Sequence, residues 1–246
     1  MEKTVAVISD IHSNFEALNA VLADIRDLGV SSIVCLGDTV GYASGARACL
    51  RVVRELACPT ILGNHDEAVA IDTTPINDMN DTATAGILFA RQRLNPAEKS
   101  WMAELPQDLV IEGVQFTHAS LAHPPLWPYI VTEEDAYRHF LRQSCSLGFC
   151  GHTHRPMVWI QGAAGRVAGK KGKDVVGLTQ GGKVLVNVGA VGQPRDGDNR
   201  ACYVIYRSEQ KTVEFRRVTY DIKRTKKKII RVGLPRYTAQ RLSLGR

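Results

Sequence analysis

The 246-residue sequence predicts an α/β fold, a layered α/β/β/α sandwich with mixed sheets and a helical insertion. Short apolar runs rich in β-branched residues alternate with helical patterns at the start, which is typical of parallel strands joined by right-handed crossovers. Later apolar runs follow one another without such helices, which favours antiparallel strands. A composition of 44% hydrophobic and 23% charged residues is that of a globular protein rather than a disordered one.

The first 62 residues alternate between strand and helix patterns. Residues 4–9 form a continuous apolar run, as expected for a strand that is covered on both faces. Ser13 and Glu16 have the spacing of a helix capping box, and Gly29 supplies a left-handed stop. The expected elements are strands at 4–9, 32–36 and 60–62, and helices between 13 and 29 and over 46–56.

The middle of the chain is expected to form a helical insertion over residues 67–108. Its two helical patterns cover 82–94 and 96–105. Residues 109–111 and 114–117, joined by an acidic residue and a glycine, then have the pattern of a tight hairpin.

The second half is predicted to contain mostly strands. A helix is expected over 133–143 and a short buried strand over 147–150. Four further strands are expected at 158–161, 183–188, 201–206 and 212–218. We expect them to be antiparallel and to form a second sheet packed on the first. Residues 162–182, rich in Gly and Lys, are expected to form a mobile surface loop or a hairpin.

The formal net charge of +6 is concentrated at the C-terminal end. Residues 211–246 contain 12 Lys and Arg side chains against Glu214 and Asp221. Within the tail 220–246, the basic stretch 223–231 has helical spacing, and three isoleucines are available to pack inward: Ile222, Ile229 and Ile230. We therefore expect a docked helical tail with a solvated basic face, and binding of nucleic acid by the tail is the alternative.

Cysteine usage and hydropathy indicate the compartment. The six cysteines include no CxxC pair, which favours free thiols over a disulfide framework. No apolar run reaches the roughly 18–20 residues of a membrane span, and the start has no signal-peptide layout. We expect one domain over residues 1–246, in the cytoplasm and without a membrane partner.

Residues suited to bind metal ions follow the ends of the predicted strands. The carboxyl ends of parallel strands share one edge, so such residues converge there even when they are far apart in the sequence. A single Asp or His in a loop carries little weight, but eight residues at strand ends predict a metal centre. They are Asp10, His12, Asp38, Asn64, His65, His118, His152 and His154. Imidazole, carboxylate and amide ligands suit Mn²⁺, Fe²⁺, Zn²⁺ or Co²⁺, whereas Cys150 fits a buried strand position.

The order of these motifs resembles the calcineurin-like metallophosphoesterase superfamily over residues 10–154. The motifs are Asp10-x-His12, Gly37-Asp38, Gly63-Asn64-His65-Asp66, His118 and Gly151-His152-Thr153-His154. Gly41-Tyr42, the stretch 187–197 and Gly233-Leu234-Pro235 are similar to the small bacterial and archaeal phosphodiesterase-like branch. The resemblance implies the fold of the metallo-dependent phosphatases.

The resemblance also implies a centre of two divalent ions, with manganese the first choice and Fe, Zn, Co, Ni or Mg as alternatives. Asp10, His12 and His154 would hold one ion, Asn64, His118 and His152 the other, and Asp38 would bridge both. A bridging carboxylate suits this arrangement because it screens two cations about 3.5–4 Å apart. A hydroxide held between the ions would then attack phosphorus in line.

The resemblance implies that the two residues following Asn64, which are His65 and Asp66, support the reaction. By the resemblance, His65 protonates the leaving group or stabilises the transition state, and the alternative is that it only hydrogen-bonds its own loop. Asp66 either orients His65 or caps the helix that follows.

The loop after Asp38 departs from the protein phosphatases, which carry an Asp-Arg pair there. Gly41 and Tyr42 occupy those places here. Another cation must then contact the phosphoryl oxygens, and Arg195, in a Gly- and Pro-rich turn, is the candidate. The alternative is a turn arginine in solvent. Asn64 is the second expected substrate contact.

The predicted activity is that of a two-metal-dependent phosphoesterase on a small phosphodiester or nucleotide substrate. Phosphomonoesters, phosphoproteins and dinucleoside polyphosphates are alternative substrates, and a nuclease that uses the basic tail is a further alternative. A non-catalytic protein-interaction scaffold is the alternative from another class. Three side chains would stack on a base or, as we favour, pack the loop after His118: His123, Trp127 and Tyr129.

Overall fold

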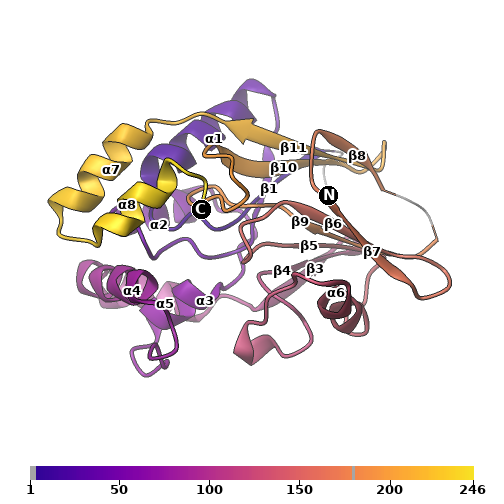
Figure 1. Ribbon diagram of the computed structural model, residues 1–246, viewed down its shortest axis with the longest axis horizontal. Coiled ribbons are helices and arrows are strands. Elements are labelled where there is room, and N and C mark those ends of the chain that lie inside the picture. The colour runs from indigo at the N-terminus through magenta and orange to yellow at the C-terminus, as the bar shows by residue number, and fades with distance from the viewer. Residues whose placement is uncertain (1–3, 179–180) are drawn as a thin grey trace.

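The computed structural model describes residues 4–178 and 181–246. Two mixed sheets lie face to face with helices on their outer sides, which is the predicted α/β/β/α arrangement (Figure 1). The strands are β1 (Thr4–Ile8), β2 (Ser32–Cys35), β3 (Asp108–Ile111), β4 (Val114–Thr117), β5 (Leu147–Cys150), β6 (Met157–Gln161), β7 (Val167–Lys171), β8 (Val175–Gly177), β9 (Lys183–Asn187), β10 (Ala201–Arg207) and β11 (Thr212–Val218). The α-helices are α1 (Phe15–Asp27), α2 (Ala46–Glu55), α3 (Asn64–Ala70), α4 (Asp81–Arg93), α5 (Pro96–Ala103), α6 (Glu133–Phe140), α7 (Ile222–Arg231) and α8 (Arg236–Leu242).

The first sheet has the strand order β2-β1-β10-β11-β8. β1 and β2 are parallel, as the alternating pattern predicts, and the other pairs are antiparallel. The prediction that β10 and β11 belong to a second sheet was wrong. β10 instead pairs with the second edge of β1, where it satisfies backbone groups that α1 and β2 leave open.

The second sheet has the order β3-β4-β5-β9-β6-β7. The predicted hairpin of β3 and β4 is confirmed. β4, β5 and β9 are parallel, so β9 is antiparallel only to β6, and our expectation for β9 was wrong in part. The parallel strands in each sheet end at the same side of the molecule, and their following loops meet there.

Two local predictions need correction. Residues 60–62 form no strand, and Thr60 makes only an isolated bridge to Cys35. Ser13 does not cap α1, because its φ of 56° is left-handed, and Asn14 accepts the capping bond instead. For the segment 162–182 the hairpin alternative is confirmed, because β7 pairs antiparallel with β6. The segment also contains β8, and its residues 179–180 lie outside the described part of the chain.

Apolar layers hold the sheets and helices together. Side chains from both sheets fill the space between them, including the stacked rings of Phe116 and Phe149, 5.6 Å apart. α1 and α2 cover the outer face of the first sheet, with Leu18 and Ile25 fully buried. α6 covers the outer face of the second sheet, where Phe140 packs near Trp159.

The C-terminal helices α7 and α8 pack together, and α7 contacts α1 (Figure 1). The prediction of a docked helix is confirmed: Ile229 is fully buried, and Glu16 pairs with Arg224 and Lys228. Ile230, which we expected to face inward, is 50% exposed, because it follows Ile229 on the opposite side of the helix.

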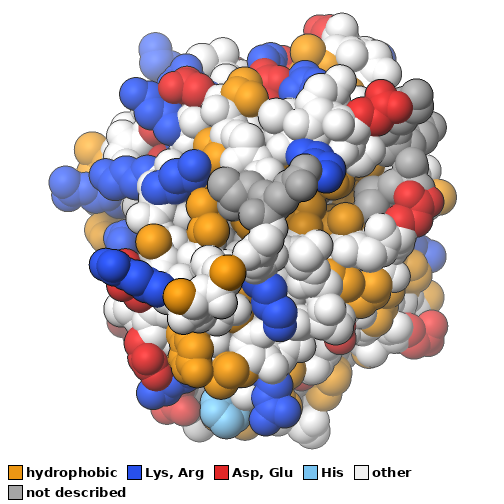
Figure 2. Space-filling model, turned by 90° about the vertical axis from the view of Figure 1, so that its right-hand side faces the viewer, with side chains coloured by type: hydrophobic (Ala, Val, Ile, Leu, Met, Phe, Trp, Pro, Cys, Tyr) orange, Lys and Arg blue, Asp and Glu red, His pale blue; other side chains and the backbone are white. Residues whose placement is uncertain are grey.

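Two further observations concern whether a helix could span a membrane and how charge is distributed on the surface. No helix in residues 4–178 and 181–246 has both the length and the apolar character needed to cross a bilayer. On the face viewed in Figure 2, basic and acidic side chains are interspersed.

Candidate metal centre

The predicted ligands meet at the end of the sheets where the parallel strands finish. They follow four strands: β1 (Asp10 and His12), β2 (Asp38), β4 (His118) and β5 (His152 and His154), with Asn64 at the start of α3. None of the seven is more than 9% exposed. Asp10 and His154 meet although most of the chain separates them, so the convergence is as the sequence predicts.

Strained backbone places most of these side chains. Five candidate ligands have left-handed φ values: Asp10 54°, His12 47°, Asp38 52°, His152 66° and His154 58°. A non-glycine residue in such a region costs about 1–3 kcal/mol, and such strain collects at functional sites. Hydrogen bonds between the loops hold the conformation, among them His12 N to Asp38 O at 2.9 Å and Gly151 N to His118 O at 3.0 Å.

One cluster joins the loops after β1 and β5. Asp10, His12 and His154 offer ligand atoms that all lie within 4.8 Å of one another. Nε2 of His154 lies 3.0 Å from Nε2 of His12 and 3.1 Å from Oδ1 of Asp10. Two ligands that each bind one ion at about 2.0–2.2 Å lie about 3 Å apart, so these spacings fit a shared metal ion.

A second cluster contains Asp38, His118 and His152. Oδ2 of Asp38 lies 3.3 Å from Nε2 of His118, and the same oxygen lies 3.5 Å from Nε2 of His12 in the first cluster. Oδ1 of Asn64 is 3.2 Å from Nε2 of His118, which places the predicted amide ligand at this cluster. Asp38 thus lies between the two sets of donors.

Backbone carbonyl groups fix which ring nitrogen each histidine turns to the centre. Nδ1 of His12, His118 and His154 lies 3.2, 2.7 and 2.6 Å from the carbonyl oxygens of Val40, Leu36 and Gln193, respectively. A carbonyl only accepts, so each Nδ1 carries a proton and each Nε2 is the ring nitrogen turned to the centre. His152 is reversed: its Nε2 donates to the Trp127 carbonyl at 2.9 Å, which leaves Nδ1 for the centre.

One carboxylate oxygen of the site lacks a hydrogen-bond partner. Oδ1 of Asp10 is buried without a hydrogen bond, although His154 Nε2 is near. Glycines let the acids come close, because a Cβ at Gly63 would overlap the Asp38 carboxylate and one at Gly151 would overlap that of Asp10. Buried carboxylates and facing lone pairs are costly unless a cation lies among them, so the residues fit bound divalent metal.

Burial and charge shift the protonation of these groups in opposite directions. Burial alone would lower the pKa of His118, but the Asp38 carboxylate outweighs it and raises the pKa to about 9. Burial would raise the pKa of Asp38, but His118 and His65 hold it well below its usual value. Burial lowers the pKa of His152 to about 3. A metal ion at this cluster must therefore displace the His118 proton, so metal binding weakens in acid.

His65 lies beside the centre and Asp66 supports the loops. A ring nitrogen of His65 lies within 4.8 Å of ligand atoms of His12 and Asp38, and Nδ1 has no hydrogen bond. The carboxylate of Asp66 accepts from the backbone N–H groups of Thr39, Val40 and Gly63. These are the contacts of the capping alternative for Asp66, and they fix the loop that carries Asp38.

Arg195 lies next to the centre rather than free in solvent. Its guanidinium donates to Tyr42 Oη at 3.2 Å and to Gln193 Oε1 at 3.0 Å. The Tyr42 ring lies 4.7 Å from the His12 ring and 4.8 Å from the His65 ring, between Arg195 and the candidate ligands. No carboxylate among the described residues pairs with Arg195, so its charge is available to an anion.

Arg241 of α8 is a residue that sequence reasoning missed. Its Cζ lies 5.8 Å from the centroid of the Tyr42 ring, and that of Arg195 lies 5.6 Å from the same centroid. Burial and the charge of Arg195 lower the pKa of Arg241. Arg241-Leu242 belongs to the ending that is similar to the phosphodiesterase-like branch, but the sequence contains no sign of its place at the site, because only the docking of α8 brings it there.

The aromatic residues after His118 line the same region. Trp127 Nε1 donates to Glu67 Oε2 at 2.8 Å, which supports packing for this ring. Tyr129 stacks on the His152 imidazole with ring centroids 4.1 Å apart, yet it is 50% exposed. His123 is exposed. Tyr129 is thus the ring that a substrate can reach beside the centre.

Comparison with known proteins places this arrangement in a family. Residues 4–211 match the calcineurin-like phosphoesterase superfamily domain. The chain is 37% identical to the protein MJ0912 of Methanocaldococcus jannaschii over the full length of both. A metallophosphoesterase structure from Sphaerobacter thermophilus is 34% identical, covers 99% of both chains and has a TM-score of 0.87. Protein PH1004 of Pyrococcus horikoshii OT3 shares the fold, with 19% identity, 99% and 98% of the two chains covered and a TM-score of 0.80.

These matches agree with the motifs and with the two clusters of candidate ligands. They support a phosphoester hydrolase that uses divalent metal ions. The chain belongs to the calcineurin-like phosphoesterase superfamily.

Proposed function

We propose that the protein is a two-metal-dependent phosphoesterase that hydrolyses phosphodiester or nucleotide phosphate bonds. The observation that carries the proposal is the position of Asp38. Its Oδ2 lies 3.5 Å from Nε2 of His12 in one cluster and 3.3 Å from Nε2 of His118 in the other. One carboxylate oxygen between two donor sets is what a pair of neighbouring cations requires.

The ligands are assigned to the two ions by cluster. The first set is Asp10, His12 and His154, the second is Asn64, His118 and His152, and Asp38 is common to both. When bound, the ions lower the pKa of water towards neutrality and neutralise charge on the phosphoryl oxygens. The protein contributes by holding the free ring nitrogens in place before the ions bind.

Arg195 is suited to bind the phosphoryl oxygens that the metal ions leave uncovered. It lies beside the centre on Tyr42 and has no carboxylate partner among the described residues. Arg241 adds a second positive charge near the same ring. The loop after Asp38 itself lacks the Asp-Arg pair, and we assign these two arginines a role in binding phosphate.

His65 is suited to stabilise the leaving oxygen by a hydrogen bond. Burial lowers its pKa to about 4, although Asp38 opposes this, so the ring is neutral near pH 7. A neutral imidazole carries one N–H and donates it without charging the buried site. This geometry favours transition-state stabilisation over proton delivery by a charged imidazole.

The proposed substrate is a small diester or nucleotide in the cytoplasm. Without the Asp-Arg pair, the site is expected to prefer diesters, which carry less charge than monoesters. Two basic side chains of the tail, Arg224 and Lys228, are paired with Glu16, so part of its charge serves to dock α7 on α1.

The test is hydrolysis of bis-p-nitrophenyl phosphate by the purified protein with added Mn²⁺, beside p-nitrophenyl phosphate. We expect metal-dependent release of p-nitrophenol that is faster for the diester and stops when a chelator is added. Metal analysis of the same sample should find two divalent ions per chain. A protein that binds two metal ions but cleaves no phosphoester would instead act as a scaffold.

A further inference from the structure

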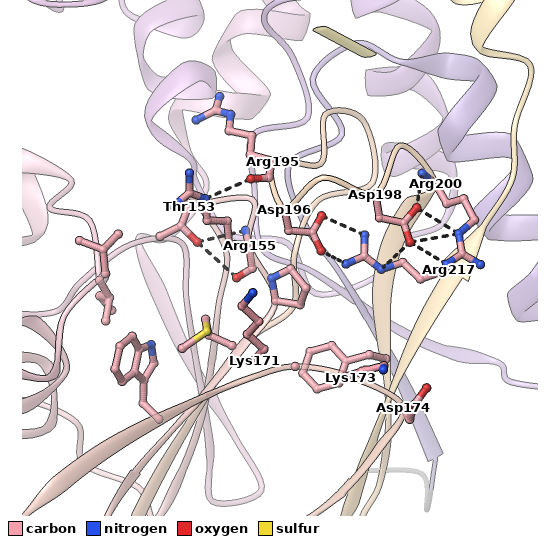
Figure 3. A pocket seen from close by; sticks show the side chains of 17 residues that line it. Thr153, Arg155, Lys171, Lys173, Asp174, Arg195, Asp196, Asp198, Arg200 and Arg217 are labelled. Carbon is pink, nitrogen blue, oxygen red and sulfur yellow. Dashed lines mark hydrogen bonds and ion pairs between the residues drawn. The ribbon is translucent and has the colours of Figure 1, made fainter. Parts of the chain in front are cut away.

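A cavity of about 620 Å³ opens next to the metal centre (Figure 3). Its walls come from β6, β7, β11 and the loop that carries Arg195. Thr153, one wall residue, stands between the candidate ligands His152 and His154, and the N–H of Arg195, another, donates to the His154 carbonyl at 3.1 Å. The cavity therefore shares a wall with the centre, and its volume is typical of sites for organic ligands.

Part of the lining is aromatic, and its rings pack against the backbone of two glycines. The rings of Trp159 and Phe215 line the cavity. A Cβ at Gly169 would overlap the Trp159 ring, and a Cβ at Gly172 would overlap the Phe215 ring. Only glycine lets these rings lie so close to β7 and the turn after it. Trp159 and Phe215 are 4% and 7% exposed, so they form the apolar base of the cavity wall and belong to the core behind it.

The cavity has an excess of positive charge. Six basic side chains and three carboxylates line it. Arg200 and Arg217 are paired with Asp196 and Asp198, as the dashed lines in Figure 3 show. Lys171 and Lys173 form no ion pair or hydrogen bond through their side chains with other described residues. Lys171 extends from the end of β7 into the middle of the cavity in Figure 3.

We propose that this cavity binds the part of the substrate that does not react, and that it selects an organic group carrying a further phosphate. This is the chemistry of a nucleoside diphosphate or a longer nucleotide. The proposal rests on the proposed function, because it adds a substrate class to the same centre. The apolar part of the wall contacts the organic group, while Lys171 and Lys173 bind the second phosphate.

The test compares a variant with Lys171→Gln and Lys173→Gln with wild type and with Lys170→Gln. Lys170 is the matched control, since it is exposed on the same strand but does not line the cavity. Calorimetry would measure adenosine 5′-diphosphate binding, and hydrolysis of bis-p-nitrophenyl phosphate would measure the centre. We expect the double variant to bind the nucleotide at least about tenfold more weakly, with the control within about twofold of wild type. Hydrolysis of the small diester should stay within about twofold in both variants.

Equal nucleotide affinity in the three proteins, or no binding by wild type at about 1 mM, overturns the proposal. If wild type hydrolyses the diester but binds no nucleotide, the cavity assignment is wrong and the proposed function stands. If nucleotide binding depends on the two lysines but no protein hydrolyses the diester, the cavity assignment holds and the proposed function fails. Circular dichroism of the variants checks that the fold is retained.

Discussion

The metal centre and the cavity beside it share a wall but are built in different ways. The centre consists of buried side chains on short loops, held in strained conformations by hydrogen bonds between the loops. The cavity combines buried apolar side chains with charged side chains, several of them exposed, on the β6–β7 hairpin and the loops beside it. The comparison indicates that the reaction is fixed by rigid local geometry, whereas the choice of substrate depends on parts that can change without disturbing it.

The largest effect is expected from Asp38→Asn, which removes the negative charge that both clusters share. We expect kcat/KM for bis-p-nitrophenyl phosphate to fall by about 10³-fold or more, since two-metal catalysis provides several kcal/mol. Metal analysis should show less than two ions per chain. Asp78→Asn is the matched control, because Asp78 is exposed and belongs to none of the candidate metal groups. Unchanged activity in Asp38→Asn would remove the proposed mechanism.

The next largest effect is expected from His65→Gln, which tests whether His65 supports the reaction or binds a metal ion. Loss of the imidazole should lower kcat by about 10²-fold, a typical contribution of such a group. The metal content should remain at two ions per chain. His65 also lies within reach of His12 and Asp38, so a fall in metal content would show that it is a ligand. His123→Gln, a change on an exposed histidine, provides the control.

A buried histidine of α6 tests whether burial alone explains the properties of the centre. His139 is fully buried, and its Nδ1 accepts from Leu121 N at 3.1 Å. Burial lowers the pKa of His139 to about 4, and the charge of Lys183 acts in the same direction. A hydrogen bond to Gln143 opposes this and raises the pKa. No carboxylate is grouped with it among the candidate metal clusters of the described residues.

The sign of the resulting pH dependence follows from the lowered pKa. Between about pH 6.5 and 4 the unfolded chain binds a proton at His139 and the folded chain does not, so stability falls as the pH falls. From pH 7 to 5 we expect a loss of about 2 kcal/mol from this residue. Urea unfolding of wild type and His139→Asn in a chelator would isolate it, because Asn Oδ1 can accept from Leu121 N. A variant with the same pH dependence as wild type would contradict the assignment.

The centre could be predicted from the sequence because all its residues except Asn64 lie within four positions of strand ends. Strand length and apolar pattern are local properties, and the shared edge of parallel strands then brings Asp10, Asp38 and His152 together. The pairing of β10 with β1 could not be predicted in this way, since the pattern of an apolar strand does not specify its neighbour. The left-handed conformation of Ser13, which moves the cap to Asn14, is likewise imposed by the loop contacts rather than by residue type.

Arg241 shows why the residues that surround the centre could not be predicted from the sequence. It belongs to a basic tail whose pattern predicts only an amphipathic helix, and its approach to Tyr42 depends on how α7 and α8 dock. The contrast between the metal centre and the cavity therefore also holds for the side of the centre where Arg241 approaches Tyr42. Residues that select the substrate come from segments whose positions are set by tertiary packing.

The smallest effect on catalysis is expected from the two arginines beside Tyr42. Arg195→Gln should raise KM for bis-p-nitrophenyl phosphate by about tenfold, because a charge-assisted hydrogen bond contributes about 1.5–3 kcal/mol and the ions supply the rest of the attraction. Arg241→Gln should raise it by only about threefold, since charge at longer range is partly screened. Steady-state kinetics at two ionic strengths would measure both, with Arg241 the more sensitive to salt. If Arg195→Gln changed neither KM nor kcat while Arg241→Gln did, the C-terminal helix would hold the principal phosphate contact and Arg195 would serve only to position Tyr42.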